Sequence, residues 1–247
     1  MKEISQEYGA DQAGVLYGFA FQPNTAGVEL PATQWPARLR AGMDDGGFVW
    51  LHVNLAHSGS EKWLRAHLGL PEDFYAGLRE GPASTRIEQL DGEALRAVIN
   101  DVIFTFGSPA VEVSSLWVYA DAHLLITARL KPLRSVDALR AAVKRGVRFG
   151  SPVDLLVHLL SGQADVLAQI VRDASQAVDA IEDRQLAERP RHSRAELASM
   201  RRVLVRLQRL LAPSRRRCFA CLTAHRPGWT PTRCRACANP AKNLPWR

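Results

Sequence analysis

Short apolar stretches, each bounded by glycine or polar turn residues, dominate the first third of the chain. Residues 14–21 and 47–54 are apolar or β-branched runs of this kind, and both are typical of β-strands. The apolar residues between positions 59 and 68 follow a polar start and precede a glycine, which favours a short helix. We expect a second short helix after Pro71.

The next segment consists of β-rich runs separated by turn signals. The runs cover residues 84–90, 94–106, 111–120 and 123–129. Short connections of the Asp-Gly and Gly-Ser-Pro type favour antiparallel neighbours in a meander. Ser135, followed by Asp137, is then expected to cap a helix that ends at Gly146. Residues 1–150 are therefore predicted to form one α/β domain.

From residue 151 onward the pattern is that of long helices. Ser151 as the N-cap, Pro152 at the first helical position and Asp154 in the first turn together predict a helix start. Apolar residues then repeat at spacings of mostly three and four, interrupted by Gln163: Val153, Leu156, Leu160, Leu167, Ile170, Ala174, Ala177 and Ile181. A seam of this kind requires a partner helix.

A second helical pattern supplies that partner. It begins at Ser193, has Glu196 three residues later as a capping box, and carries one apolar stripe as far as Leu211. The polar residues 188–192 connect the two helices. Residues 151–213 are therefore predicted to form a long antiparallel helical hairpin.

The positive charge of the chain is confined to its last residues. Residues 214–247 contain seven Arg, one Lys and no acidic residue, a contribution of +8 to a total of +7. The preceding residues therefore carry about −1. All four cysteines also lie in this tail, at positions 218, 221, 234 and 237. Body and tail consequently need separate explanations.

The chain lacks the signals of membrane insertion and secretion. No window reaches the roughly 18 to 20 apolar residues of a spanning helix. The N-terminal residues are polar and lack the apolar core of a signal peptide. We therefore expect a chain that stays in the cytoplasm and has no membrane span.

Nothing in the body indicates an enzyme, a resident cofactor or a metal site. The histidines at 52, 57, 67, 123, 158 and 192 form no metal-ligand spacing, and no nucleotide-binding or nucleophile motif is present. We therefore assign no catalytic, cofactor-binding or metal-binding residue. The second long helix has a basic face with Arg194, Arg201, Arg202, Arg206 and Arg209. Acidic residues on the neighbouring helix offer partners for it, so a solvated charged face is favoured over nucleic-acid binding.

The tail permits two interpretations. Cys218-Phe-Ala-Cys221 and Cys234-Arg-Ala-Cys237 have the pattern of a four-thiolate zinc ribbon, although the twelve residues between the pairs are a short spacer. The alternative is a shifted reading frame. One back-translation of Ser214 to Cys221 reads Glu-Pro-Ala-Ala-Leu-Phe-Arg-Leu in the neighbouring frame, and a composition of 27 Arg to 5 Lys indicates GC-rich codons. We favour the shifted frame and expect residues 214–247 to be irregular.

Residues 14–211 together resemble the soluble domain of ZntB-type zinc transporters in the CorA family of divalent-cation transporters. The segments that carry the resemblance are Trp50-Leu-His52 followed by Trp63-Leu64, Leu90-Asp-Gly-Glu-Ala-Leu-Arg96, Leu116-Trp-Val-Tyr119 leading through Leu124-Leu-Ile-Thr127 to Arg129, Pro132-Leu-Arg-Ser-Val-Asp137, and Gly150-Ser-Pro152. Their order and spacing are specific in combination.

The resemblance implies an α/β (α+β) fold, with a mixed sheet packed between helices and a long helical hairpin, assembled as a pentamer into a funnel under the inner membrane. Zinc or another divalent metal cation would be the transported ion. Family members continue into a stalk helix and two membrane spans with a Gly-Met-Asn loop. This chain departs from the pattern at about residue 213, so no pore residue can be assigned to it.

Three hypotheses follow. The leading one is the cytoplasmic funnel of a divalent-cation transporter that lacks its pore in this chain. The second is a stand-alone regulator that pairs with full-length subunits. The third is a zinc-ribbon protein that binds nucleic acid through its basic, cysteine-containing tail. The choice of cation and the direction of transport do not follow from these residues.

Overall fold

The computed structural model describes residues 14–23, 25–41, 46–79, 85–90, 94–103 and 113–186, together with 197–198, 201–202, 204–205 and 208. In the described residues, one mixed sheet has the strand order β2-β1-β3-β7-β6-β5-β4. The strands are β1 (Val15–Phe21), β2 (Val28–Glu29), β3 (Phe48–Asn54), β4 (Arg86–Gln89), β5 (Leu95–Val102), β6 (Val113–Ala120) and β7 (Leu124–Arg129). The helices are η1 (Ala32–Gln34), α1 (Trp35–Ala41), α2 (Ser60–His67), α3 (Glu72–Arg79), α4 (Arg134–Lys144) and α5 (Pro152–Leu186).

The middle of the sheet is the parallel pair β3 and β7, which aligns Trp50 with Leu125 and His52 with Thr127. Every other pairing in the sheet is antiparallel. The strands from β4 to β7 pair in chain order, which confirms the predicted meander. The chain crosses from β3 to β4 through α2 and α3, and this crossover permits β7 to lie parallel to β3.

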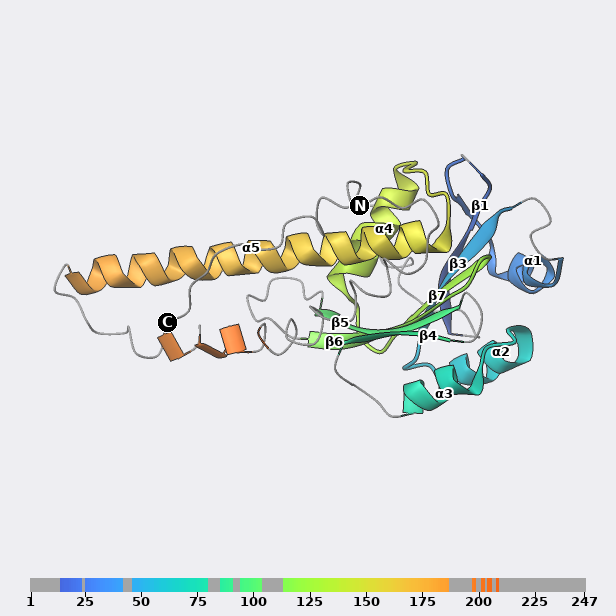
Figure 1. The fold of residues 1–247 in the computed structure, drawn as a ribbon, viewed down its shortest axis with the longest axis horizontal. Coiled ribbons are helices and arrows are strands. Elements are labelled where there is room, and N and C mark those ends of the chain that lie inside the picture. The colour runs from blue at the N-terminus through green and yellow to red at the C-terminus, as the bar shows by residue number, and fades with distance from the viewer. Residues whose placement is uncertain are drawn as a thin grey trace, which may run out of the picture.

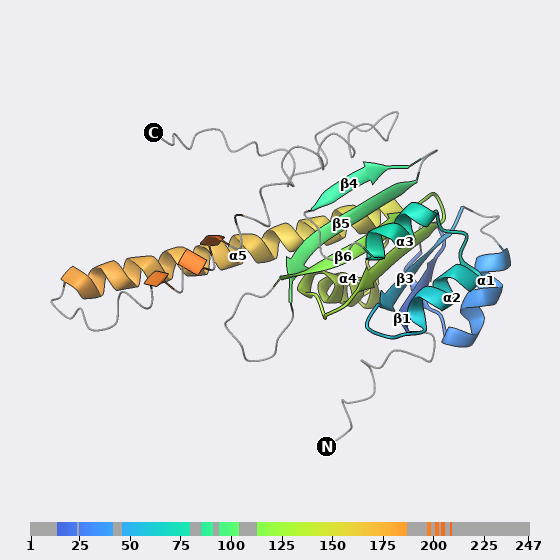
Figure 2. The ribbon, with the colours of Figure 1, turned by 90° about the horizontal axis from the view of Figure 1, so that it is seen from below.

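Helices cover both faces of the sheet (Figures 1 and 2). One face packs against α4 and α5 through residues such as Phe19, Trp50 and Leu139, all at most 1% exposed. The other face packs against α1, α2 and α3 through residues such as Leu64 and Phe74. Burial on both faces explains why β3 is a continuous apolar run rather than an alternating one.

The predicted start of α4 needs a correction. Its N-cap is Leu133, without a side-chain capping bond, and the helix begins at Arg134. Ser135 therefore lies inside the first turn and does not cap it. Its backbone N–H instead donates to Asp101 Oδ2 of β5 at 3.0 Å. A carboxylate distant in sequence has taken over the role of a local cap.

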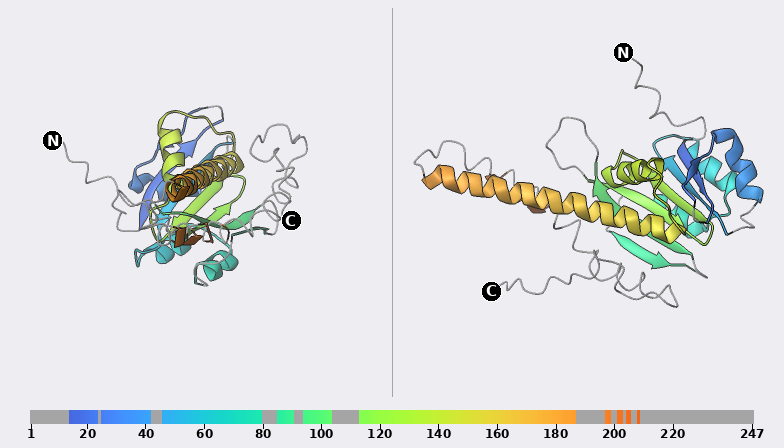
Figure 3. Two further views of the ribbon diagram at one scale, coloured as in Figure 1. Left: turned by 90° about the vertical axis from the view of Figure 1, so that its left-hand side faces the viewer. Right: turned by 90° about the horizontal axis from the view of Figure 1, so that it is seen from above.

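The start of α5 agrees with the prediction, because Asp154 N–H donates to Ser151 Oγ at 3.1 Å. With 35 residues, this helix is about 52 Å long at 1.5 Å per residue. Its first part lies on α4 and the sheet, and the rest extends beyond the sheet (Figure 3).

The second hairpin helix lies mostly outside the described residues. Those that are described, Leu197–Ala198, Arg201–Arg202, Leu204–Val205 and Gln208, are helical and lie alongside the outer half of α5 (Figures 1 and 2). The basic face and the turn that joins the two helices remain predictions. Residues 214–247 with their four cysteines also fall outside the described residues.

Candidate functional site

A chain of buried hydrogen bonds crosses the central strands β3 and β7. Trp50 Nε1 donates to Thr127 Oγ1 at 2.8 Å, and His52 Nδ1 lies 2.8 Å from the same oxygen. On the other side of the imidazole, Arg129 Nε donates to His52 Nε2 at 2.9 Å. All four side chains are at most 6% exposed. They form one continuous polar chain inside a largely apolar layer.

The direction of these hydrogen bonds follows from the arginine. A guanidinium only donates, so His52 Nε2 accepts and the neutral imidazole carries its proton on Nδ1. Nδ1 then donates to Thr127 Oγ1, whose own proton is directed to the Leu51 carbonyl oxygen at 3.3 Å. Burial first, and then the charge of Arg129, lower the pKa of His52 well below 6.5. Both ring nitrogens are used, which leaves no lone pair for a metal ion.

The same chain contacts β1 and α4 through stacked side chains. The Tyr17 ring stacks on the His52 ring with centroids 4.9 Å apart. The guanidinium of Arg140, from α4, lies 4.6 Å from the centre of the Tyr17 ring. The stack therefore links two strands to the helix layer.

A second polar group joins β5 to the N-terminal turn of α4. Asp101 Oδ2 accepts hydrogen bonds from the backbone N–H of Ser135 at 3.0 Å and from its hydroxyl at 2.5 Å. Burial raises the pKa of Asp101 despite these bonds. Burial also raises the pKa of Asp137, while Arg129 and Arg140 oppose that shift. Basic groups on β7 and α4 thus offset part of the negative charge of the buried carboxyl groups on β5 and α4.

The first half of α5 is attached by apolar and polar contacts. Leu155, Leu156 and Leu159 are at most 1% exposed and belong to the main core. Leu167 packs against Val102 of β5 in a separate small cluster. Between these two contacts, Gln163 Nε2 donates to the backbone carbonyl of Asn100. The polar residue that interrupts the apolar seam therefore has a specific partner on the sheet.

From residue 165 onward, α5 exposes acidic side chains: Asp165, Asp173, Asp179, Glu182 and Asp183. Exposed Arg172 on the same helix, and Arg201 and Arg202 of the segment alongside it (Figure 1), offset part of this negative charge. In the described ranges, no group of three or more His, Cys, Asp or Glu side chains is arranged to hold a metal ion. The described part of this helix therefore has an acidic surface but no discrete metal site.

The described histidines make separate contacts and belong to no metal-binding group among the described residues. His57 Nδ1 accepts from Gly59 N–H at 3.1 Å, His67 stacks on Trp63, and His123 Nδ1 lies 3.3 Å from Gly47 O. His158 lies against Phe149. His192 lies outside the described residues. Each described histidine has a local structural contact.

Sequence reasoning missed the buried polar residues as a group. A signal was available, because Asp101 and Arg129 are charged residues inside runs predicted as strands. Charged side chains in such positions are rarely buried without partners.

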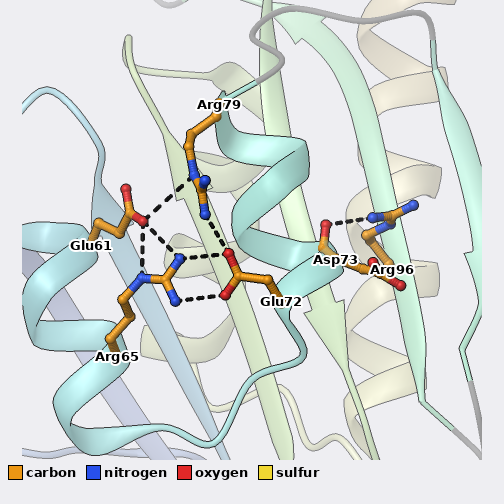
Figure 4. A network of polar contacts seen from close by, with 6 residues as sticks. All are labelled: Glu61, Arg65, Glu72, Asp73, Arg79 and Arg96. Atoms are coloured by element: carbon orange, nitrogen blue, oxygen red, sulfur yellow. Dashed lines mark hydrogen bonds and ion pairs between the residues drawn. The ribbon is translucent and has the colours of Figure 1, made fainter.

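An exposed network of ion pairs joins α2 to α3 (Figure 4). Arg65 makes a bidentate contact with Glu72 at 2.7 and 3.0 Å and also bonds to Glu61 at 3.0 Å. Arg79 contacts the same two carboxylates, and Arg65 lies 3.8 Å from the centre of the Tyr75 ring. The network is internally neutralised, so it fits a role in holding the two helices together rather than in binding an ion.

Comparison with known families places these features in context. The sequence profile described as "CorA-like Mg²⁺ transporter protein" matches residues 45–239. This range contains most of the sheet, all of α5 and the four cysteines. No helix among the described residues is long and apolar enough to cross a membrane.

Two curated relatives illustrate the similarity. The divalent cation transporter CmaX of Pseudomonas aeruginosa is 29% identical over 208 residues, which cover 83% of this chain and 61% of the relative. The zinc transport protein ZntB of Yersinia enterocolitica is 24% identical over 180 residues, which cover 73% of this chain and 54% of the relative. The matched part of the chain thus spans little more than half the length of these proteins.

Solved structures agree with the sequence comparison. The structure of full-length CmaX aligns with a TM-score of 0.74 and 25% identity over 83% of this chain and 62% of that one. The soluble domain of CorA from Methanocaldococcus jannaschii aligns with a TM-score of 0.62 and 15% identity over 89% of this chain and 83% of that one. The second likeness concerns the fold alone.

Proposed function

The chain belongs to the CorA-like Mg²⁺ transporter family, and we propose that it forms the cytoplasmic funnel of a transporter for divalent metal cations. The observation that carries this proposal is the alignment with full-length CmaX, which covers 83% of this chain and 62% of that protein. The funnel alone moves no ion, and the pore is proposed to belong to sequence outside residues 1–213.

The geometry of α5 supports this role. The sheet and α4 hold its first half, while its outer half extends beyond the sheet (Figure 1). Acidic residues on that outer half are exposed. In a ring of such helices, the carboxylates that the basic face of the second hairpin helix does not neutralise would place negative charge along the path of an approaching cation and raise its local concentration.

The name of one relative supports a more specific proposal about which cation is transported. ZntB is named as a zinc transport protein, and CmaX as a transporter of divalent cations. We propose zinc as one cargo among divalent cations. We also propose a homo-oligomeric, pentameric assembly, with no nucleic-acid partner.

A domain exchange tests the proposed function. The part of CmaX that aligns with this chain is replaced by residues 14–211, so that the remainder of CmaX follows the second hairpin helix. We expect the chimera to insert in the membrane and to have the same subunit number as CmaX by native mass spectrometry. A chimera that reaches the membrane only as monomers would contradict the proposal.

The tail is tested separately. We propose that residues 214–247 arise from a shifted reading frame and that the neighbouring frame continues the helical protein. On this proposal, the extension of the family match over residues 214–239 does not reflect common ancestry. Sequencing the DNA from the codon for residue 210 onward, in all three frames, is expected to reveal an acidic helix, two apolar spans and Gly-Met-Asn. If no frame contains them and the purified chain binds one zinc ion per molecule, the cysteines form a zinc ribbon instead.

A further inference from the structure

The backbone of Asn100 in β5 bonds to side chains from two other elements. Its N–H donates to Thr85 Oγ1 at 3.1 Å, and its carbonyl accepts a hydrogen bond from Gln163 Nε2 of α5. The N–H and C=O of one strand residue point to the same edge, which here is the edge that pairs with β4 as far as Arg86 and Val98. Gln163 thus bonds to the sheet through a backbone carbonyl of β5 just beyond its pairing with β4.

Gln163 lies between the main core contacts of α5 and its last apolar contacts with the sheet. Leu159, one turn earlier, is 1% exposed, whereas Ala164 and Asp165 are exposed. One turn later, Leu167 makes the last described core contact with β5, through Val102. Val166 and Ile170 of α5 and Val113 of β6 pack against the same cluster, so the hydrogen bond lies just before the last turns through which α5 is attached to the sheet.

The residue after Asn100 holds the other helix of the same layer. Asp101 accepts both the N–H and the hydroxyl of Ser135 in α4. Two consecutive residues of β5 therefore bind α5 and α4. Because α4 and α5 also pack on each other, a shift at the end of β5 is transmitted to both helices.

We propose that the Gln163–Asn100 hydrogen bond is a latch that sets the direction in which α5 leaves the sheet. Gln163 is half-buried, so a water molecule can take the place of its amide at the Asn100 carbonyl when the bond opens. Opening the bond therefore costs little free energy. The apolar contacts of Leu155, Leu156 and Leu159 stay in place meanwhile. Beyond Gln163 only the small cluster around Leu167 and Val102 still joins the described part of α5 to the sheet, so the outer half of α5 can change direction by loosening that cluster while the main core remains packed. This inference concerns the isolated chain and is independent of transport.

Distance measurements on the full-length chain test the latch. The four native cysteines are replaced by serine, and spin labels are attached at Lys62→Cys on α2 and Ser175→Cys on α5, both exposed positions. Pulsed electron–electron double resonance then gives the distribution of distances between the two spin labels. We expect Gln163→Leu to raise the population of other orientations of α5 about fivefold. This is the change in an equilibrium constant that the loss of one neutral hydrogen bond produces. Gln163→Glu should broaden the distribution further, because its carboxylate faces a carbonyl.

Gln169→Leu is the matched control. Its amide bonds to Asp173 and Arg172 on α5 itself, so we expect the wild-type distribution. Gln163→Asn, which keeps the amide but shortens its reach, provides a mild second variant in case Gln163→Leu fails to fold. If folded Gln163 variants keep the wild-type distribution, even with a lower melting temperature, the contact only stabilises the fold and the latch is refuted.

Discussion

Arg129 Nε donates a hydrogen bond to His52 Nε2 at 2.9 Å inside the sheet domain, where both side chains are at most 6% exposed. Protonation of that nitrogen would remove the acceptor and place two cations in contact. The folded protein therefore keeps His52 neutral, and its pKa lies well below 6.5.

This pairing predicts acid sensitivity. In the unfolded chain His52 titrates near 6.5, so below that pH the unfolded state binds a proton that the folded state does not. The stabilisation is fully present above pH 6.5 and declines as the pH falls. We expect His52 alone to lower the free energy of unfolding by up to about 1.4 kcal/mol per pH unit below 6.5. Urea denaturation between pH 7.5 and 5 measures this slope.

His52→Gln is the control, because glutamine retains an acceptor for Arg129 without titrating. The raised pKa values of Asp101 and Asp137 act in the opposite sense, favouring the folded state at acid pH, and are common to both proteins. The difference between the two pH profiles therefore isolates His52. Equal slopes would show that this histidine is not buried in the neutral form.

Removal of the Asp101 carboxylate should loosen α4. Asp101→Ala leaves the N–H and hydroxyl of Ser135 without their acceptor in the interior, and we expect a loss of about 2–4 kcal/mol. Asp101→Asn keeps an acceptor and should lose about 1 kcal/mol. Thermal and urea denaturation measure both. If the double variant with Ser135→Ala loses the sum of the two single losses, the two side chains do not act as a pair.

Gly14 should tolerate no side chain. It adopts φ +78°, and a Cβ built there would lie 2.0 Å from Ser60 Oγ, a hydroxyl held by Asn54 O at 2.5 Å. Gly146 has a similar φ of +84° with no atom within 4 Å of the same position. We expect Gly146→Ala to cost about 1–2 kcal/mol for conformation alone and Gly14→Ala to cost clearly more. Equal losses in denaturation experiments would contradict the close contact with Ser60.

The network of ion pairs predicts a titration anomaly at Glu72. Its hydrogen bond with Arg65, aided by Arg79, lowers the pKa of Glu72 from 4.5 to about 2. Carboxyl NMR titration should find this value in the wild type, and Arg65→Gln should return it most of the way to 4.5. Arg79→Gln should have the smaller effect. Because the group is exposed, 0.5 M salt should weaken the shift in the wild type. A Glu72 that titrates normally would show that the bidentate contact is absent in solution.

Local patterns predicted most elements of this fold. The strand runs around Trp50, Trp117 and Leu125 and the meander follow from apolar runs bounded by turn residues. The start of α5 at Ser151 follows from its capping residues. Signals of both kinds act over a few positions. The same patterns did not identify β2, η1 and α1. Residues Val28–Glu29 form a short edge strand, and the helix beginning at Trp35 has a proline at its second position. Neither segment therefore shows a sustained periodicity of hydrophobic residues.

The buried polar contacts could not be predicted from neighbouring residues. Trp50 and Thr127 are separated by 77 positions, and Asp101 and Ser135 by 34. Ser135 followed by Asp137 suggested a local cap, but Asp101 supplies a stronger, charged acceptor for the same N–H group. Gln163 was visible as an interruption in an apolar seam, and only the fold showed that Asn100 O is its partner.

Uptake of cations by the CmaX chimera tests the central claim most directly. Proteoliposomes with equal amounts of membrane-inserted protein are loaded with a fluorescent indicator, and the initial rates for Zn²⁺ and Mg²⁺ are compared among CmaX, the chimera and empty vesicles. A funnel domain of this family should support uptake well above that of empty vesicles for at least one of these divalent cations. A chimera that assembles with the subunit number of CmaX but admits neither cation would contradict the assignment of this chain as a transporter funnel.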